Sequence, residues 1–153
     1  MSAVPIPQLH YRQMRMGDLP EVAGLEKTLY EFPWSLGNFR DSVTAGYDCW
    51  VATHGETAIA YAVLMVALDE AHLLNFAVAA PWQNQGIGRG FLEHMIEVAR
   101  LAGCQIVYLE VRPSNLAARH LYKTMGFQQI AIRPDYYPAV AGREDALFLG
   151  LAL

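Results

Sequence analysis

The chain has 153 residues, 54% of them apolar, and a formal net charge of −4 at pH 7. Such a chain is long enough for one compact domain with a buried core. The negative charge and the lack of a Lys/Arg-rich run argue against general nucleic-acid binding, and no apolar run approaches the roughly 18 residues of a membrane span. We therefore expect one cytoplasmic domain over residues 1–153, without a nucleic-acid or membrane partner, in which residues 1–8 form a flexible N-terminal segment. A monomer is compatible with these features.

The residues that most often bind metals are scattered. Cys49 and Cys104 each lie in an apolar stretch, which favours reduced core thiols over a disulfide or a metal pair. The five histidines show no spacing typical of metal ligands. We predict no metal, and the mildly acidic composition suits a basic partner.

The first elements in chain order are a strand and a helix. Residues 9–14 alternate apolar and polar side chains, as in a half-buried strand. Asp18 is a candidate N-cap, and Glu21 three residues later would complete a capping box. The apolar spacing that follows predicts a helix to about Tyr30.

A proline then separates this helix from the next one. Pro33 interrupts the helical pattern, and Ser35 is placed to cap a short helix through Val43. Phe32 and Trp34 have two readings at this stage. They are either core anchors between the helices or one wall of a substrate groove.

The rest of the chain predicts a sheet with two further helices. Apolar-rich runs separated by turn residues indicate an antiparallel meander, and a helical crossover later in the chain implies two parallel neighbouring strands. The expected strands are 48–53, 57–66, 71–79, 105–112, 127–133 and 146–151, the expected helices are 91–102 and 115–125, and residues 135–138 and 142–145 join the last two strands.

Residues 83–90 read QNQGIGRG and lie between an apolar run and an amphipathic run, as in a strand-to-helix turn. Alternating glycines let a backbone approach a ligand closely, and the first amides of the following helix favour bound phosphate. A Rossmann fingerprint is excluded because its third glycine position is Phe91, and the Lys-Ser/Thr of a P-loop is absent. The loop is therefore a candidate phosphate site, with an empty tight turn as the alternative.

Glu110 is the first candidate for acid–base chemistry. It lies near the carboxyl end of the strand after the crossover, on the more polar face, where open α/β sheets often bind ligands. A partly desolvated carboxylate there could take a proton from an ammonium group or from an ordered water. The alternative is a solvated strand residue paired with Arg112 on the same face.

Asn115 and Tyr122 are seven residues apart on one predicted helix, so they project in nearly the same direction. A phenol could support a leaving thiolate, although full proton transfer is uphill by roughly 1.5 pK units in reference values. The alternative for Tyr122 is an aromatic ring packed under the sheet.

From about Met14 to Leu149 the chain resembles the GCN5-related N-acetyltransferases (GNAT), and more narrowly the bacterial ribosomal-protein-alanine N-acetyltransferases of the RimI type. The glycine loop alone is typical of the whole superfamily, whereas the Phe-Pro-Trp-Ser, Tyr-Tyr-Pro and Gly-Arg-Glu-Asp-Ala segments are more specific. The matching segments are 32–35, 68–71, 75–78, 83–89, 109–115, 121–122, 126–127, 136–138 and 142–146.

The resemblance implies a GNAT-like α/β fold, with a mixed, mostly antiparallel sheet of about seven strands flanked by about four helices. It also implies acetyl-coenzyme A (acetyl-CoA) as co-substrate, Glu110 as general base and Tyr122 as general acid. The implied cofactor contacts are Phe76, Ala77 and Val78 to the pantetheine arm, Asn84, Gln85, Gly86, Ile87, Gly88 and Arg89 to the pyrophosphate, and Asn115 further along. Many family members have Arg where this chain has Asn84, which removes one charge beside the phosphates.

The activity that the resemblance implies is direct acetyl transfer to a protein N-terminal amine, that of the alanine of small-subunit ribosomal protein eighteen, a basic partner that acidic residues such as Glu144 and Asp145 could guide. The alternatives are other protein N-termini, lysines, a small-molecule amine, or a CoA-binding module without turnover.

Overall fold

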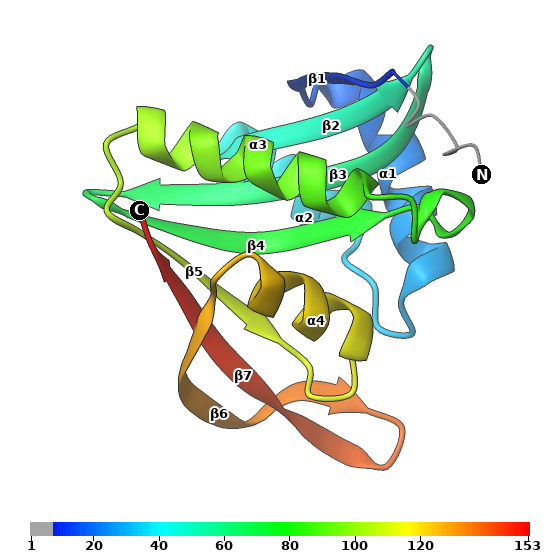
Figure 1. Ribbon diagram of the computed structural model, residues 1–153. Coiled ribbons are helices and arrows are strands. Elements are labelled where there is room, and N and C mark those ends of the chain that lie inside the picture. Colours follow the sequence, from blue (N-terminus) through cyan, green and yellow to red (C-terminus); the bar gives the residue numbers. More distant parts are fainter. Residues whose placement is uncertain (1–7) are drawn as a thin grey trace, which may run out of the picture. The chain divides into compact units, whose positions relative to one another are not determined.

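The computed structural model describes residues 8–153, so all but residue 8 of the predicted flexible segment falls outside the described part. Within residues 8–153 there are seven strands and four α-helices (Figure 1). In chain order they are β1 (His10–Gln13), α1 (Leu19–Leu29), α2 (Leu36–Thr44), β2 (Asp48–His54), β3 (Thr57–Ala67), β4 (Glu70–Val78), α3 (Ile87–Leu101), β5 (Ile106–Val111), α4 (Leu116–Thr124), β6 (Gln128–Ala139) and β7 (Gly142–Ala152). The predicted α/β class is confirmed.

The strands follow the hydrogen-bonded order β1-β2-β3-β4-β5-β7-β6. The β1/β2, β5/β7 and β6/β7 pairs are antiparallel, whereas β4 and β5 are parallel over Glu70–Leu73 and Ile106–Leu109. Helix α3 connects β4 to β5, as a parallel pair requires. The predicted mixed sheet with a helical crossover is therefore confirmed.

The described residues group into two compact units. One comprises residues 8–63 with Asn75–Met95, and the other comprises Leu64–Leu74 with Ile96–Leu153. The first contains β1, β2, α1, α2 and the glycine loop, and the second contains β5, α4, β6 and β7. In the first unit, α1 and α2 lie behind β2 in Figure 1 and the start of α3 lies in front. That the chain is a single domain stays a prediction.

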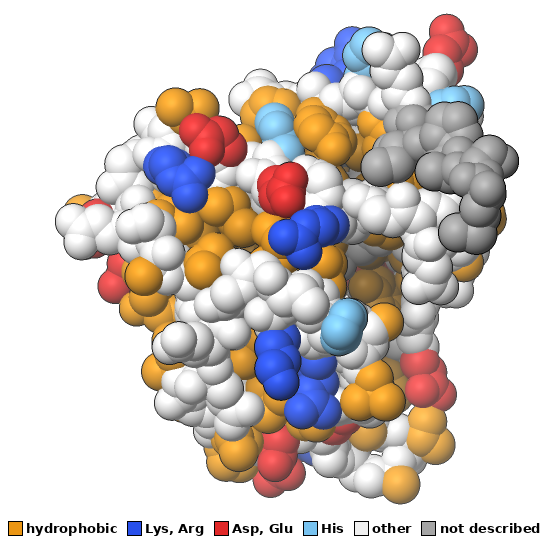
Figure 2. All heavy atoms as spheres, in the orientation of Figure 1, with side chains coloured by type: hydrophobic (Ala, Val, Ile, Leu, Met, Phe, Trp, Pro, Cys, Tyr) orange, Lys and Arg blue, Asp and Glu red, His pale blue; other side chains and the backbone are white. Residues whose placement is uncertain are grey.

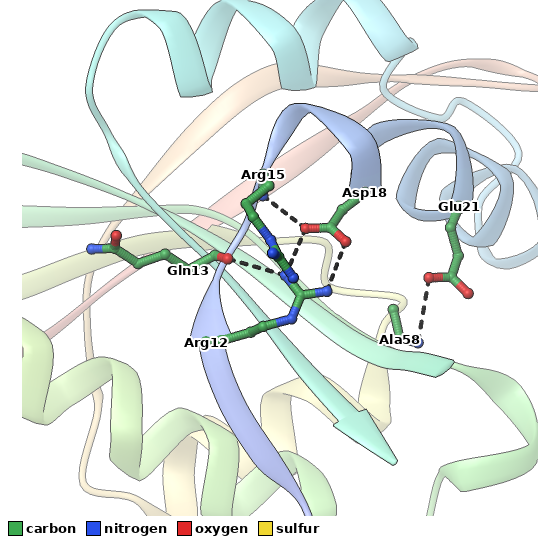
Figure 3. Close-up of polar contacts among 6 residues, drawn as sticks. All are labelled: Arg12, Gln13, Arg15, Asp18, Glu21 and Ala58. Carbon is green, nitrogen blue, oxygen red and sulfur yellow. Dashed lines mark hydrogen bonds and ion pairs between the residues drawn. The ribbon is translucent and has the colours of Figure 1, made fainter. Parts of the chain in front are cut away.

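Asp18 is the N-cap residue of α1 as predicted, but its side chain makes no capping hydrogen bond to the helix. The carboxylate of Asp18 accepts hydrogen bonds from both terminal nitrogens of Arg12, at 2.7 and 2.8 Å, and from the backbone N–H of Arg15 at 2.7 Å (Figure 3). Glu21 does not complete a capping box either, because its Oε1 accepts from the N–H of Ala58 at 3.4 Å. A bidentate guanidinium pair is stronger than a neutral cap, and the hydrogen bond from Arg12 lowers the pKa of Asp18.

The predicted cap of α2 is confirmed. The hydroxyl of Ser35 accepts from the N–H of Asn38 at 3.1 Å, and the amide oxygen of Asn38 accepts from the N–H of Ser35 at 2.9 Å. This reciprocal pair satisfies two backbone donors at the start of α2. It also sets the direction in which the Phe-Pro-Trp-Ser segment enters the helix.

Each unit has its own buried apolar residues. In the first unit Phe39, Val51 and Tyr61 are fully buried. In the second, Leu109 is 1% exposed, as expected for the apolar face of β5. Cys49 and Cys104 are buried free cysteines. No helix among the described residues is long and apolar enough to cross a membrane.

The C-terminal hairpin differs from its prediction. Residues expected as loops belong to strands, so β6 and β7 extend to a short turn before Gly142, whose φ is +87°. The β6/β7 register shifts between Arg133 and Tyr137, next to Pro134. Prolines lack the N–H that a central strand needs, and β6 lies at the edge of the sheet, where proline and a bulge are tolerated.

Candidate functional site

The glycine loop leads directly into α3. The helix begins at Ile87 rather than near the predicted Phe91, and the N–H of Gly90 bonds to the carbonyl of Gly86 at 3.2 Å. Glycine lowers helix propensity in the interior of a helix, but its cost is small in a first turn that has few internal bonds. The backbone N–H groups of residues 87–89 come before the first hydrogen bond within the helix. They are therefore available to an anion at the positive end of the helix dipole.

The turn before the helix depends on two unusual backbone conformations and two side-chain hydrogen bonds. Asn84 has a φ of +60° and Gly86 a φ of +81°. The side-chain amide of Gln83 donates to the carbonyl of Val78 at 2.8 Å, and that of Gln85 donates to the carbonyl of Pro81 at 3.1 Å. The first bond ties the loop to the end of β4, and the second ties it to the short 3-10 helix Ala80–Trp82 that follows β4.

The end of β4 is anchored on both sides. The ring of Phe76 stacks on that of Phe91, with centroids 5.5 Å apart, and Ala77 is 5% exposed. After Val78 the strand ends with the N–H of Ala79 donating to the carbonyl of Ile59 at 2.8 Å. The three residues expected to bond a pantetheine arm thus lie at the end of β4, just before the glycine loop.

Arg89, the cation expected near the phosphates, lies on the exposed surface of α3. Its Nε is 3.3 Å from Oε1 of Glu93, and both side chains are more than half exposed, at 54% and 57%. A second pair of opposite charge, Arg100 with Glu97, follows on the same helix. Figure 2 shows blue and red side chains next to one another in the region where Figure 1 shows α3. Exposed ion pairs contribute little to stability, so Arg89 can exchange Glu93 for a phosphate at a small cost in free energy.

In the second unit, Glu110 is a nearly buried carboxylate, with its side chain 9% exposed. Its Oε2 lies 2.5 Å from Nε2 of His72 on β4, and its Oε1 lies 3.3 Å from Nε of Arg133 on β6. NH1 of Arg112, the partner suggested for Glu110, donates to Oε1 of Glu144 at 3.1 Å, so the pairing of Glu110 with Arg112 stays a prediction. His72 comes from β4, which neighbours β5, and Arg133 comes from β6, which lies beyond β7 in the sheet.

Phe148 supports this carboxylate from the next strand. It lies opposite Glu110 in the β5/β7 register, and its ring stacks on Tyr108 with centroids 5.1 Å apart. The guanidinium of Arg133 lies 4.4 Å from the centroid of the same ring, and the ring of His72 is 6.3 Å away. An aromatic surface therefore holds both partners of Glu110 in place.

The charge of Glu110 contributes to a raised pKa of two tyrosines of β6. The pKa of Tyr136 is raised, first by burial and then by Glu110, while Arg133 opposes the shift. Burial also raises the pKa of Tyr137, whose ring carries the guanidinium of Arg112 at 4.3 Å from its centroid. Both phenols therefore stay protonated at neutral pH.

Glu144, which was expected to guide a basic substrate, already has local partners. Its carboxylate accepts from the hydroxyl and the N–H of Ser114, both at 3.0 Å, and from Arg112. The Ser114 hydroxyl is the largest cause of a lowered pKa of Glu144. This carboxylate ties the β6/β7 hairpin to the start of α4.

Asn115 and Tyr122 both lie on α4 or at its start. The side chain of Asn115 caps the helix, since its Oδ1 accepts from the N–H of Ala118 at 3.2 Å. Tyr122 is 6% exposed and its ring packs edge-to-face on Phe127, with centroids 5.6 Å apart. Tyr122 therefore packs in the interior of the second unit. Its role as a general acid stays a prediction, and so does the contact of Asn115 with the cofactor.

Among residues 8–153 no group of three His, Cys, Asp or Glu side chains is arranged to hold a metal ion. The first unit contains a loop at a helix N-terminus that suits an anion, and the second contains a carboxylate held by two basic partners. A family model described as the acetyltransferase (GNAT) family matches residues 12–127.

The chain belongs to the acetyltransferase (GNAT) family.

Individual GNAT proteins narrow the resemblance. The chain is 40% identical over 136 residues to the [Ribosomal protein bS18]-alanine N-acetyltransferase of Escherichia coli K12, covering 89% of this chain and 92% of that protein. The crystal structure of the E. coli ribosomal-protein-S18-alanine N-acetyltransferase matches with a TM-score of 0.88 and 38% identity, covering 95% and 94% of the two chains. Arabidopsis thaliana NAA60, solved with a bisubstrate analogue, shares the fold at a TM-score of 0.85 and 18% identity, with coverages of 95% and 98%. The predicted RimI-type resemblance is confirmed.

Sequence reasoning missed two partners in this GNAT chain, His72 and Arg133. They lie 38 residues before and 23 residues after Glu110 (110 − 72 and 133 − 110) and meet it through strand register. The only available signal was the alternation of β4, which places His72 on the face opposite buried Ala71 and Leu73.

Proposed function

We propose that this GNAT protein transfers an acetyl group from acetyl-CoA directly to the α-amine of a protein N-terminus, with the N-terminal alanine of ribosomal protein bS18 as its substrate. The observation that carries the proposal is the 40% identity to the E. coli bS18-alanine N-acetyltransferase over 92% of that protein's length. The local structure supports it through two features, an anion-binding loop and a nearly buried carboxylate.

The loop fits the phosphates of acetyl-CoA. The amides at the start of α3 carry partial positive charge, and Gly86 adopts a φ of +81° that side-chain-bearing residues rarely adopt. Residues 84–89 hold the pyrophosphate mainly through backbone groups, with Arg89 adding one charge. Phe76, Ala77 and Val78 bond the pantetheine arm along β4, and Asn115 contacts the cofactor further along. Acetyl-CoA supplies the acetyl group as a thioester.

Glu110 acts on the acceptor amine. An α-amine has a reference pKa of roughly 7.7–8.0, so much of it is protonated at neutral pH and must lose a proton before it attacks. A carboxylate held by Arg133 and His72 has few conformations open to it, which places the proton acceptor before the substrate arrives. Glu110 takes this proton directly or through a water molecule.

The remaining groups stabilise negative charge. A backbone N–H near Val78 donates to the carbonyl oxygen as charge develops on it, an effect typically of about 3 kcal/mol. Tyr122 donates a hydrogen bond to the leaving sulfur. Because a phenol is a weaker acid than a thiol by roughly 1.5 pK units, this bond stabilises the thiolate first and the proton passes later.

Intact mass spectrometry of two peptides tests the substrate class. One begins with a free alanine and lacks lysine, and the other has a blocked terminus and one free lysine. The proposal predicts one acetyl group on the first peptide and none on the second. The reverse pattern would identify a lysine acetyltransferase, and modification of neither peptide would direct the search to small amines or to a CoA-binding role.

A further inference from the structure

The two oxygens of Glu110 have partners of different kinds. Oε1 faces Arg133 at 3.3 Å, and Oε2 faces Nε2 of His72 at 2.5 Å. A guanidinium keeps its charge at any pH used in an assay, whereas an imidazole gains or loses its charge close to neutral pH. His72 is therefore the partner that has both a neutral and a protonated form.

The contact also determines which ring nitrogen carries hydrogen. An ionised carboxylate is only an acceptor of hydrogen bonds, so the nitrogen that faces it must be a donor. Neutral His72 therefore carries its hydrogen on Nε2 and donates it to Glu110. The side chain of His72 is 24% exposed against 9% for Glu110, so the imidazole is the more open of the two groups to solvent protons.

We infer that His72 is a positioning residue for Glu110, which orients the carboxylate when it is neutral and weakens it as a proton acceptor when it is protonated. This inference rests on the proposed function. In the neutral state the Nε2–H bond holds Oε2 without adding a charge. When His72 is protonated, Glu110 lies between two cations. They stabilise the ionised form of the carboxylate, so Glu110 takes up a proton from the acceptor amine less readily.

Other charged and titratable groups around the pair come from the strands packed against it. On β6 these are Arg133 and Tyr136, and burial raises the pKa of Tyr136. On β5 the residue paired with His72 is Tyr108, a phenol, and on β4 Glu70 lies two residues before His72. β7 contributes the aromatic ring of Phe148. A change in activity with pH that is present in the wild type and absent from His72→Gln is attributable to the imidazole.

Two substitutions separate the orienting role from the charge. His72→Gln keeps an N–H donor at a similar reach and cannot become charged, while His72→Leu keeps bulk and removes the donor. We expect His72→Gln to retain kcat at pH 8.5 within about threefold and His72→Leu to lose about tenfold or more, with the KM for acetyl-CoA unchanged in both.

The decisive readout is the ratio of kcat/KM between wild type and His72→Gln as a function of pH, because ionisation of the substrate cancels in this ratio. It should be constant at high pH and fall by up to tenfold per pH unit once the imidazole is protonated. His10→Gln, which removes an exposed imidazole from β1, is the matched control and should give a flat ratio. A flat ratio for His72→Gln as well would overturn the charge effect, and equal activity of His72→Leu and wild type would overturn the orienting role.

A second measurement does not need turnover. Nitrogen-15 NMR of the imidazole at pH 8.5 reports which ring nitrogen carries hydrogen, and Nε2–H is expected for His72. The opposite tautomer would contradict the inference. If no peptide is acetylated, the proposed function has failed, while this NMR result still decides whether His72 donates to Glu110.

Discussion

Glu26 is a buried carboxylate that joins helix α1 to three other segments of the first unit. It is 3% exposed, and its Oε2 accepts from the N–H of Trp34 at 2.8 Å. Its Oε1 accepts from the hydroxyl of Tyr61 at 2.8 Å and from the side-chain amide of Asn75 at 3.3 Å. Helix α1 is thereby joined to the Phe-Pro-Trp-Ser segment, to β3 and to β4.

Replacing Glu26 by Gln keeps the shape but removes one acceptor. If the amide oxygen faces Tyr61 and Asn75, the NH2 group meets the N–H of Trp34, and a buried donor loses its partner. A hydrogen bond to a charged group contributes about 1.5–3 kcal/mol, and the two bonds that remain become weaker neutral ones. The neutral amide is easier to bury, which offsets part of this loss, so we expect a net destabilisation of about 2–3 kcal/mol.

Urea unfolding followed by circular dichroism measures this change as a lower midpoint with an unchanged m-value. The melting temperature should fall by about 5–10 °C, at roughly 2–4 °C per kcal/mol for a chain of this length. Tyr61→Phe is the matched variant, and the double variant should cost less than the sum of the two because Glu26→Gln already weakens the bond that Tyr61→Phe removes. A Glu26→Gln protein within about 0.5 kcal/mol of wild type would refute this reasoning.

Four further predictions concern single residues. Glu110→Gln should lower kcat by about 10²–10⁴-fold, the usual worth of a general base, while acetyl-CoA binding measured by calorimetry stays the same; an unchanged rate at every pH would remove Glu110 from the chemistry. Tyr122→Phe should slow the chemical step in single-turnover kinetics, and equal rates together with lower stability would assign it to packing alone. Gly86→Ala should weaken acetyl-CoA binding, because a φ of +81° strains any side-chain-bearing residue; equal affinity would show that this turn does not set the loop. Burial raises the pKa of Cys49 to about 11, so its alkylation by iodoacetamide should be slow at pH 8 and accelerate only toward that value, and rapid reaction at pH 8 would contradict its buried placement.

The sequence predicted well what depends on local pattern. Period-two alternation placed Leu109 on the apolar face of β5 and Glu110 on the other, and Ser35 was recognised as a cap because its partner Asn38 is only three residues away. The start of α3 was placed late, because Gly88 and Gly90 weaken a propensity signal although a first helical turn tolerates them.

The contacts that depend on distant strands were not predictable. Asp18 pairs with Arg12 instead of capping α1, and Glu21 reaches Ala58, which is 37 residues away. The pairing of Glu110 with His72 follows from the register of β4 on β5, which no spacing within one segment specifies. The strand and the face on which Glu110 lies were therefore predicted correctly, while the groups that hold its carboxylate required the structure.

One competition experiment tests the central claim most directly. A peptide copying the N-terminus of bS18, with a free terminal alanine and an internal lysine, is incubated with the protein and acetyl-CoA, and fragmentation mass spectrometry locates any acetyl group. The account predicts a single acetyl group on the alanine α-amine, and its loss when Glu110→Gln replaces the wild type. Acetylation of the lysine side chain instead, or an undiminished yield with Glu110→Gln, would contradict it.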